Sequence, residues 1–133
     1  MIFVDASVWI NFFNGQESAE VRRLTELLAD GAAPLGMADL TLFEVLRGFR
    51  HPQDFHAARD ALAALPVIDI GGEAHALLAA EHYRALRAQG VTVRSPVDVL
   101  LASYCIEHGH ALLHSDRDFD ALETLRGLRV WRH

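Results

Sequence analysis

The sequence predicts an α/β fold, a three-layer α/β/α sandwich around a central, mostly parallel sheet. Short apolar stretches alternate with segments whose apolar residues recur at helical spacing, which is typical of βαβ units. The 133 residues are 51% hydrophobic and 23% charged, as in ordinary globular proteins. A chain of this length buries roughly two-thirds of its unfolded surface, so we expect residues 1–133 to form one domain.

The first part of the chain predicts two strands and three helices. Residues 1–4 are apolar and rich in branched or aromatic side chains, which favours a buried strand. Apolar residues recur at helical spacing over 6–13 and 18–30, and Asn-Gly and Asp-Gly pairs end these two segments. Residues 34–38 are a strand candidate, and 41–49 predict the next helix.

The middle of the chain continues the alternation. A helix is predicted over 55–65, where Pro66 stops it, and the branched residues of 67–70 favour a strand. A further helix is predicted over 74–90, closed by glycine. The helix over 95–109 begins with serine as its N-cap and proline at its first helical position, an arrangement typical of helix starts.

The last elements complete the sheet. Strands are predicted over 111–114 and 128–131, with a short helix over 119–125 between them. Strands separated by helices pair in parallel, so their carboxyl ends meet at one edge of the sheet.

Composition also predicts the compartment. The single cysteine, Cys105, cannot form an internal disulfide, and its apolar neighbours indicate a buried thiol. Asp5 interrupts the N-terminal apolar run before it reaches the length of a signal peptide, and no segment approaches the roughly 18 apolar residues of a membrane span. We therefore expect a cytoplasmic protein without membrane contact.

Five carboxylates lie where predicted strands end or predicted helices begin, and most of them are far apart in sequence. They are Asp5, Glu44, Asp98, Asp116 and Asp118. Acids gathered at one sheet edge repel one another unless a cation joins them. Carboxylates are the ligands that Mg²⁺ or Mn²⁺ prefers, and such ions activate water and screen phosphoryl charge. The pattern favours metal-dependent phosphodiester hydrolysis.

A structural role for each acid is the alternative. Asp5 is placed to cap the helix that follows it. Glu44, Asp98 and Asp118 each stand three residues after a serine or threonine, which is the spacing of a capping box. Taken singly, each of these three acids fits a cap better than a catalytic group; their combination favours the metal site.

The net charge of −6 argues against nucleic-acid binding, because phosphates require cationic partners. This objection weakens if the acids are clustered and neutralised by metal.

Four segments in order resemble the PIN-domain ribonucleases, in particular the VapC-type toxins of bacterial toxin–antitoxin pairs. Residues 2–10 give an apolar strand, an aspartate, and a serine two positions later; Ala6 stands where many members of the family have threonine. Residues 41–48 resemble the family's helix with glutamate and a following Arg-Gly. Residues 95–102 and 112–119 are similar to its third motif and its final Asp-x-Asp-Phe turn.

The resemblance implies a PIN-like fold and an acidic metal site for Mg²⁺ or Mn²⁺. It places Asp5, Glu44, Asp98 and Asp116 at this site, with Asp118 as a further ligand or a group behind the ligands. Ser7 and Ser115 match hydroxyl positions that orient carboxylates or waters.

The resemblance also implies partners: an RNA substrate, a VapB-type antitoxin that blocks the site, and a second copy in a homodimer or a larger toxin–antitoxin assembly. Arginines flanking the motifs are candidates for RNA phosphate binding, with surface arginine as the alternative; they are Arg47, Arg50, Arg94 and Arg117. An apolar set is a candidate groove for the antitoxin, with core packing favoured for most of its members; it consists of Phe12, Phe13, Phe43, Leu46 and Phe49.

Other functional classes fit less well. A haloacid-dehalogenase-type phosphatase needs a second aspartate where Ser7 stands, and both it and a receiver domain need a lysine, whereas all 12 basic residues are arginine. The histidine spacings with a single cysteine do not predict a zinc site. A degenerate PIN-like binding or scaffold module, whose acids only cap helices, remains the non-enzymatic alternative.

Overall fold

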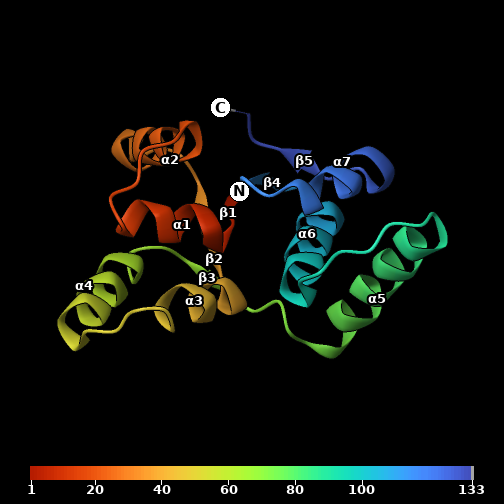
Figure 1. Ribbon diagram of the computed structural model, residues 1–133, viewed down its shortest axis with the longest axis horizontal. Coiled ribbons are helices and arrows are strands. Elements are labelled where there is room, and N and C mark those ends of the chain that lie inside the picture. Colours follow the sequence, from red (N-terminus) through yellow and green to blue (C-terminus); the bar gives the residue numbers. More distant parts are fainter. Residues whose placement is uncertain (133) are drawn as a thin grey trace.

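A parallel sheet forms the middle of the molecule. The computed structural model describes residues 1–132, in which five strands have the order β3-β2-β1-β4-β5 and every paired strand is parallel (Figure 1). The strands are β1 (Ile2–Val4), β2 (Leu35–Ala38), β3 (Val67–Ile68), β4 (Ala111–Leu113) and β5 (Arg129–Val130). The predicted parallel sheet is confirmed, with β3 and β5 two residues long each.

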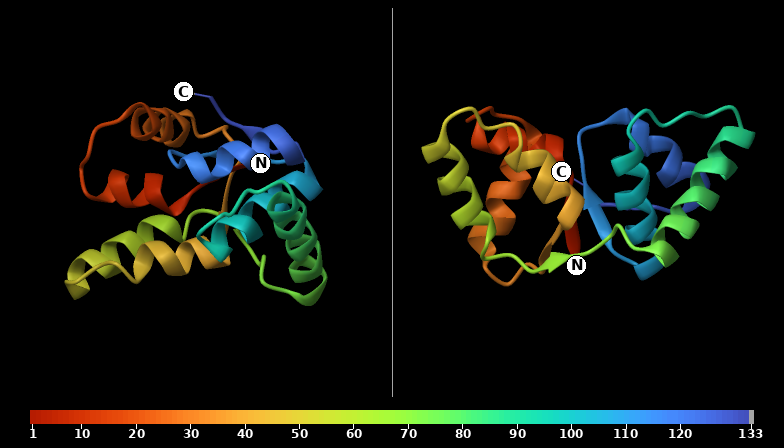
Figure 2. Two further views of the ribbon diagram at one scale, coloured as in Figure 1. Left: turned by 45° about the vertical axis from the view of Figure 1, so that its right-hand side comes forward. Right: turned by 90° about the horizontal axis from the view of Figure 1, so that it is seen from below.

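Helices cover both faces of this sheet. They are α1 (Ala6–Phe13), α2 (Ala19–Asp30), α3 (Asp39–Leu46), α4 (Pro52–Leu62), α5 (Glu73–Ala88), α6 (Pro96–His108), the 3₁₀ turn η1 (Arg117–Phe119) and α7 (Asp120–Arg126). Figure 2 shows α1 to α4 on one side and α5 to α7 on the other. The predicted three-layer α/β/α sandwich is therefore confirmed.

Each face of the sheet has its own apolar core. Because side chains of a strand alternate between faces, Ile2 and Val4 pack with α1 to α4, whereas Phe3 packs with α5 to α7. In β4, Leu112 packs with α5 to α7 and Leu113 packs with α1 to α4. The side chains of all five residues, three in β1 and two in β4, are buried. The apolar run at residues 1–4 therefore belongs to a strand covered on both sides.

The helix boundaries correct three local predictions. α3 begins at Asp39, with Ala38 as its N-cap, so Thr41 lies inside the helix and is 1% exposed; the predicted capping box from Thr41 to Glu44 is wrong. Ser95 occupies the N-cap position of α6 but makes no side-chain capping bond. α4 begins at Pro52, where proline suits the first helical position, instead of at residue 55.

Within the described residues, none of the helices has the length and apolar character required to cross a membrane.

Candidate functional site

Asp5 lies at the carboxyl end of the central strand and caps the helix that follows. Its backbone N–H donates to the Leu113 carbonyl oxygen over 2.9 Å, which extends the pairing of β1 with β4. Its carboxylate accepts from the backbone N–H of Ser7 at 3.3 Å and from the Ser7 hydroxyl at 2.6 Å. The capping role is confirmed for Asp5, yet the side chain is only 5% exposed.

The turn after β4 brings the last motif beside the first. Ser115 Oγ lies 3.3 Å from Ser7 Oγ, so the two predicted hydroxyl positions meet. Asp116 caps η1 by accepting from the backbone N–H of Asp118 at 2.9 Å. The N-cap of this turn is thus Asp116, and the capping box predicted from Ser115 to Asp118 is not formed.

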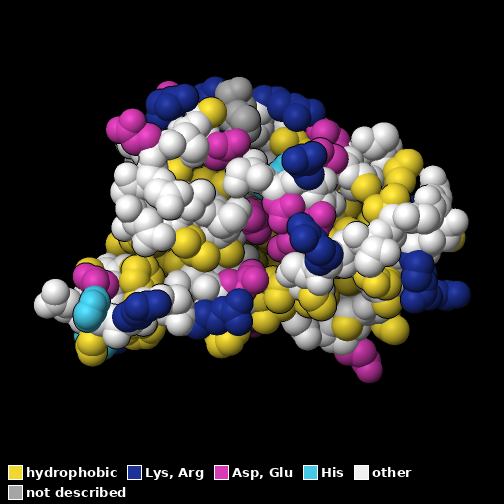
Figure 3. Space-filling view, viewed as in Figure 1, with side chains coloured by type: hydrophobic (Ala, Val, Ile, Leu, Met, Phe, Trp, Pro, Cys, Tyr) yellow, Lys and Arg dark blue, Asp and Glu magenta, His cyan; other side chains and the backbone are white. Residues whose placement is uncertain are grey.

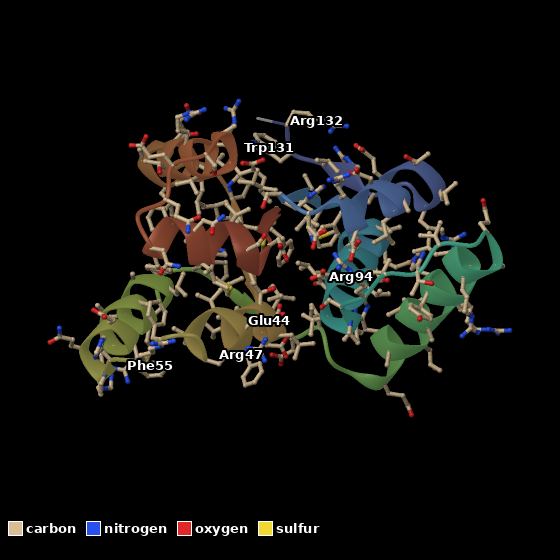
Figure 4. All side chains as sticks on the ribbon, in the orientation of Figure 1. Glu44, Arg47, Phe55, Arg94, Trp131 and Arg132 are labelled. Atoms are coloured by element: carbon tan, nitrogen blue, oxygen red, sulfur yellow. The ribbon has the colours of Figure 1, made fainter. Side chains whose placement is uncertain are left out.

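Glu44 and Asp98 reach the same region from two facing helices. Glu44 is half-buried on α3, and Asp98 is 8% exposed in the first turn of α6. Figure 3 shows acidic side chains gathered in the hollow between the two groups of helices, and Figure 4 shows Glu44 and Arg94 on either side of it. Acids from the ends of two strands and from two helices are therefore neighbours.

Burial and mutual repulsion raise the pKa values of three of these acids. Burial, together with the charges of Asp5, Glu44, Asp116 and Asp118, raises the pKa of Asp98 to about 7. Burial also raises the pKa of Glu44, with Asp5 adding to the effect and Arg47 opposing it.

The pKa of Asp5 is raised by burial as well, against the lowering effect of its hydrogen bonds from Ser7 and Ala6. Asp116 acts on Asp5 in the raising direction. The five acids therefore interact electrostatically as one set. A bound cation would relieve the repulsion between them.

The donor set suits a hard divalent cation. It offers carboxylate and hydroxyl oxygens, without thiolate, which are the donors that Mg²⁺ and Mn²⁺ accept. Among the described residues, no group of three or more His, Cys, Asp or Glu side chains is already arranged to hold a metal ion. Mg²⁺ commonly uses one or two carboxylates and keeps several waters, so the set fits this ion through direct and water-mediated contacts.

An open cavity of about 520 Å³ lies over this set, and we refer to it as the acidic cavity. It is lined by Ser7, Arg94, Ser115, Asp116, Arg117 and Asp118. Polar and charged side chains of both signs therefore line this cavity.

The predicted arginines separate into two groups. Arg94, which is 84% exposed, and Arg117 line the acidic cavity, and Arg94 Nε lies 3.4 Å from Asp118 Oδ2. Arg47 lies instead over the Phe43 ring at 5.5 Å, and Arg50 is exposed in the connection to α4.

The residues predicted to form an apolar groove differ in their burial. Phe43 is 62% exposed, whereas the other four members are partly buried against the core; they are Phe12, Phe13, Leu46 and Phe49. Core packing is thus confirmed for most of the set.

His114 lies beside Ser115 at the same edge of the sheet, where the sequence favours a bystander role over contact with substrate. Its Nδ1 accepts from the backbone N–H of Asp116 over 3.2 Å, and its ring packs against buried Phe119 at 4.7 Å. Burial lowers the pKa of His114, although nearby acids act in the opposite direction. The sequence signal for His114 is its position directly before Ser115 and Asp116 of the last motif.

Comparisons with known proteins find one family over nearly the whole chain. The family model described as the PIN domain matches residues 2–125. The chain is 31% identical over 130 residues to the VapC ribonuclease Mb1587 of Mycobacterium bovis and to the ribonuclease VapC11 of Mycobacterium tuberculosis, covering 98% of this chain and 97% of each relative.

Solved structures share the fold at lower identity. One is VapBC2 from Rickettsia felis bound to a promoter DNA fragment, with a TM-score of 0.74, 19% identity, and coverage of 99% of this chain and 100% of the other. Another is FitAcB from Neisseria gonorrhoeae, with a TM-score of 0.73, 15% identity, and coverage of 99% and 97%. DNA-bound VapBC from Salmonella typhimurium gives a TM-score of 0.73, 18% identity, and coverage of 98% and 96%.

Proposed function

The chain belongs to the PIN-domain family, and from this membership and its acidic site we propose that it is a metal-dependent endoribonuclease of the VapC toxin type. The substrate is RNA, and the reaction is hydrolysis of a phosphodiester bond. We propose that residues 1–133 form a single nuclease domain.

One observation carries the proposal: carboxylates from four separate motifs interact at the carboxyl edge of the sheet. The pKa of Asp98 responds to Asp5, Glu44, Asp116 and Asp118 together, which requires all of them to be near it. If these acids served only as helix caps, they would not need to lie close together, because each cap acts at its own helix end. The names of the relatives, which are ribonucleases at 31% identity over nearly the whole chain, supply the reaction class.

The roles of the residues follow from their placement. Asp5, Asp98, Asp116 and Glu44 are the proposed metal-binding acids, with Asp118 at the edge of the set. Ser7 and Ser115 orient the carboxylates, and Arg94 and Arg117 on the acidic cavity hold RNA phosphates. Arg47, which lies beside Glu44, would contact RNA only at the rim of the site.

Mg²⁺ or Mn²⁺ is the proposed cofactor. When bound, such an ion lowers the pKa of a water ligand and neutralises charge on the phosphoryl oxygens. The protein contributes the buried Asp5 and Asp98, whose repulsion favours cation binding, and arginines that offset the negative charge of the approaching RNA.

The proposed macromolecular partner is a VapB-type antitoxin. Two structures of the same fold are VapBC assemblies bound to DNA, and those partners belong to the solved complexes themselves. For this chain we propose a cognate antitoxin that covers the acidic cavity, and a homodimer of the toxin. Exposed Phe43, on the same helix as Glu44, is an apolar contact available to such a partner.

The decisive experiment replaces Asp5 with asparagine. Asparagine retains the helix-capping ability of aspartate, so Asp5→Asn removes the charge and leaves α1 capped. We expect Mg²⁺-dependent cleavage of single-stranded or loop RNA by the purified protein to fall by at least about 100-fold, as expected for loss of a metal ligand. The circular dichroism spectrum should be unchanged.

The matched control is Asp54→Asn, because Asp54 is an exposed acid in the first turn of α4. Its cleavage rate should equal that of the wild type. Cleavage that persists in Asp5→Asn and in the presence of EDTA would assign the activity to another site. Absence of cleavage by the wild type with Mg²⁺ or Mn²⁺ would favour a degenerate binding module.

A further inference from the structure

A second polar cavity adjoins the acidic cavity. It has a volume of about 240 Å³, and we refer to it as the lateral cavity; its lining includes His114, Arg117, Asp120 and Trp131. Three consecutive residues, 115–117, line both cavities, so the two share one wall at the turn after β4. A chain of nucleotides that has a phosphate over the acidic cavity can therefore place its neighbouring nucleotide beside the lateral cavity.

Trp131 gives the lateral cavity an aromatic wall. Its backbone N–H donates to the Leu112 carbonyl oxygen over 2.8 Å, and its ring is partly buried against the core, so the ring is held in place beside β4. Figure 4 shows Trp131 above the site, next to Arg132. An aromatic ring that lines a polar cavity is a platform on which a nucleobase stacks.

His114 supplies a donor of fixed position. Because its Nδ1 accepts from the Asp116 N–H, the proton of the neutral ring is on Nε2. Within residues 1–132, Nε2 has no hydrogen-bond partner, and the ring is held against Phe119. The lateral cavity therefore has a preoriented N–H donor on one wall.

Asp120 supplies a complementary acceptor. It is exposed at the start of α7 and lines the same cavity. A carboxylate has two oxygens, and guanine is the base whose Watson–Crick edge presents two adjacent donors, N1–H and N2–H. The neighbouring O6 of guanine is an acceptor for a donor such as His114 Nε2–H.

Arg117 links the two cavities. It is exposed and lines both cavities, and its side chain forms no hydrogen bond or ion pair with the described residues. Its guanidinium is thus available for the phosphate that joins a base in the lateral cavity to the bond at the acidic site.

We propose that the lateral cavity is a guanine-binding subsite for the nucleotide that adjoins the cleaved phosphate, with Trp131 stacking on the base and Asp120 and His114 reading its edge. The inference rests on the proposed function for the identity of the polymer. Binding of the base itself requires neither metal nor cleavage, so the two proposals are separable by experiment.

The chain contains its own reporter for this subsite. It has two tryptophans, and Trp9 is 2% exposed inside the core against which Trp131 packs, so the variant Trp9→Phe isolates the fluorescence of Trp131. In EDTA, we expect GMP to quench this fluorescence at lower concentration than AMP, CMP or UMP. Ribose 5-phosphate, which has no base, should not quench it.

Two substitutions in the Trp9→Phe background test the edge contacts. Asp120→Asn and His114→Phe should each weaken GMP binding by about tenfold, the expected effect of losing a good base contact. Phenylalanine at 114 retains the packing against Phe119. The matched control is His56→Phe, since His56 is an exposed histidine of α4 that lies outside both cavities.

The outcomes separate the two proposals. Asp5→Asn in the same background should keep GMP binding while it loses cleavage; binding without any wild-type cleavage would contradict only the proposed function. Equal quenching by all four nucleotides or by ribose 5-phosphate, or GMP binding unchanged in both Asp120→Asn and His114→Phe, would overturn the subsite.

Discussion

The Ser7 hydroxyl donates a 2.6 Å hydrogen bond to Oδ2 of Asp5, and the same hydroxyl oxygen lies 3.3 Å from Ser115 Oγ. Residues separated by 108 positions in sequence are thereby joined at the carboxyl ends of two neighbouring strands. The hydrogen bond holds Asp5 in one orientation and stabilises its ionised form, since it lowers a pKa that burial raises.

Ser7→Ala should reduce activity through Asp5 without unfolding the protein. Loss of the hydrogen bond raises the pKa of Asp5 further and frees its carboxylate to rotate, which weakens metal binding. We expect about 10- to 100-fold lower activity at limiting Mg²⁺, the usual effect of removing a group that orients a metal ligand. Ser18→Ala, at the N-cap of α2, is the control: it should lower stability by about 1 kcal/mol and leave the Mg²⁺ dependence unchanged. Identical Mg²⁺ titrations for wild type and Ser7→Ala would contradict the orienting role.

The metal-free protein should lose stability as the pH rises from about 4 to about 7. The pKa of Asp98 is raised from 3.8 to about 7, so across this range the native state holds a proton that the unfolded state has released. The free energy of unfolding therefore falls with increasing pH, by an amount on the order of a few kcal/mol, and levels off above pH 7. Thermal melting in EDTA measures this slope.

Two changes should flatten that slope. Asp98→Asn removes the titrating group, and millimolar Mg²⁺ binds the ionised cluster and restores stability above pH 7, in proportion to RT ln(1 + [L]/Kd). A melting temperature that does not respond to Mg²⁺ at pH 8 would argue against a cation site among these acids.

Arg94→Gln should weaken RNA binding more than it affects the fold. Arg94 is 84% exposed, and its ion pair with Asp118 is at the surface, so the pair contributes little to stability. We expect KM for RNA to rise while kcat changes less, and the slope of log affinity against log salt to decrease by about 1. The control is Arg59→Gln, another exposed arginine paired with an aspartate, on α4. Equal KM values for the two variants would exclude Arg94 from the RNA-binding surface.

His82 should be important for stability and unimportant for catalysis. It is 5% exposed; Arg126 Nε–H donates to its Nδ1 over 3.0 Å, so Nε2 carries the proton and donates to Glu107 over 3.2 Å. This chain of contacts joins α5, α6 and α7. His82→Leu should lower the free energy of unfolding in urea by about 1–3 kcal/mol, with unchanged activity of the folded fraction. His56→Leu, at an exposed position, should change stability by less than about 0.5 kcal/mol.

The sequence predicted the layers of the fold because each strand carries a strong local signal. The apolar run at residues 1–4 requires burial on both faces, and Leu112 and Leu113 show the same requirement. The alternation of strands and helices then leaves few topologies other than a parallel sheet.

Helix starts and side-chain partners were less predictable, because they depend on tertiary contacts. Thr41 has the chemistry of a cap, but its burial in the core places the start of α3 at Asp39, whose carboxylate also accepts from the backbone N–H of Ile70, far along the chain. The contact between His114 and the Asp116 N–H depends on the turn geometry after β4, which composition does not specify.

The central position of β1 has a consequence for synthesis of the protein. β1 pairs with β2 on one side and with β4 on the other, and β4 is not made until residue 113. During translation, a chain that lacks β4 has an unpaired edge on β1, and its acidic site lacks Asp116 and Asp118. The acidic centre therefore cannot assemble on the nascent chain until β4 and the turn that follows it have left the exit tunnel.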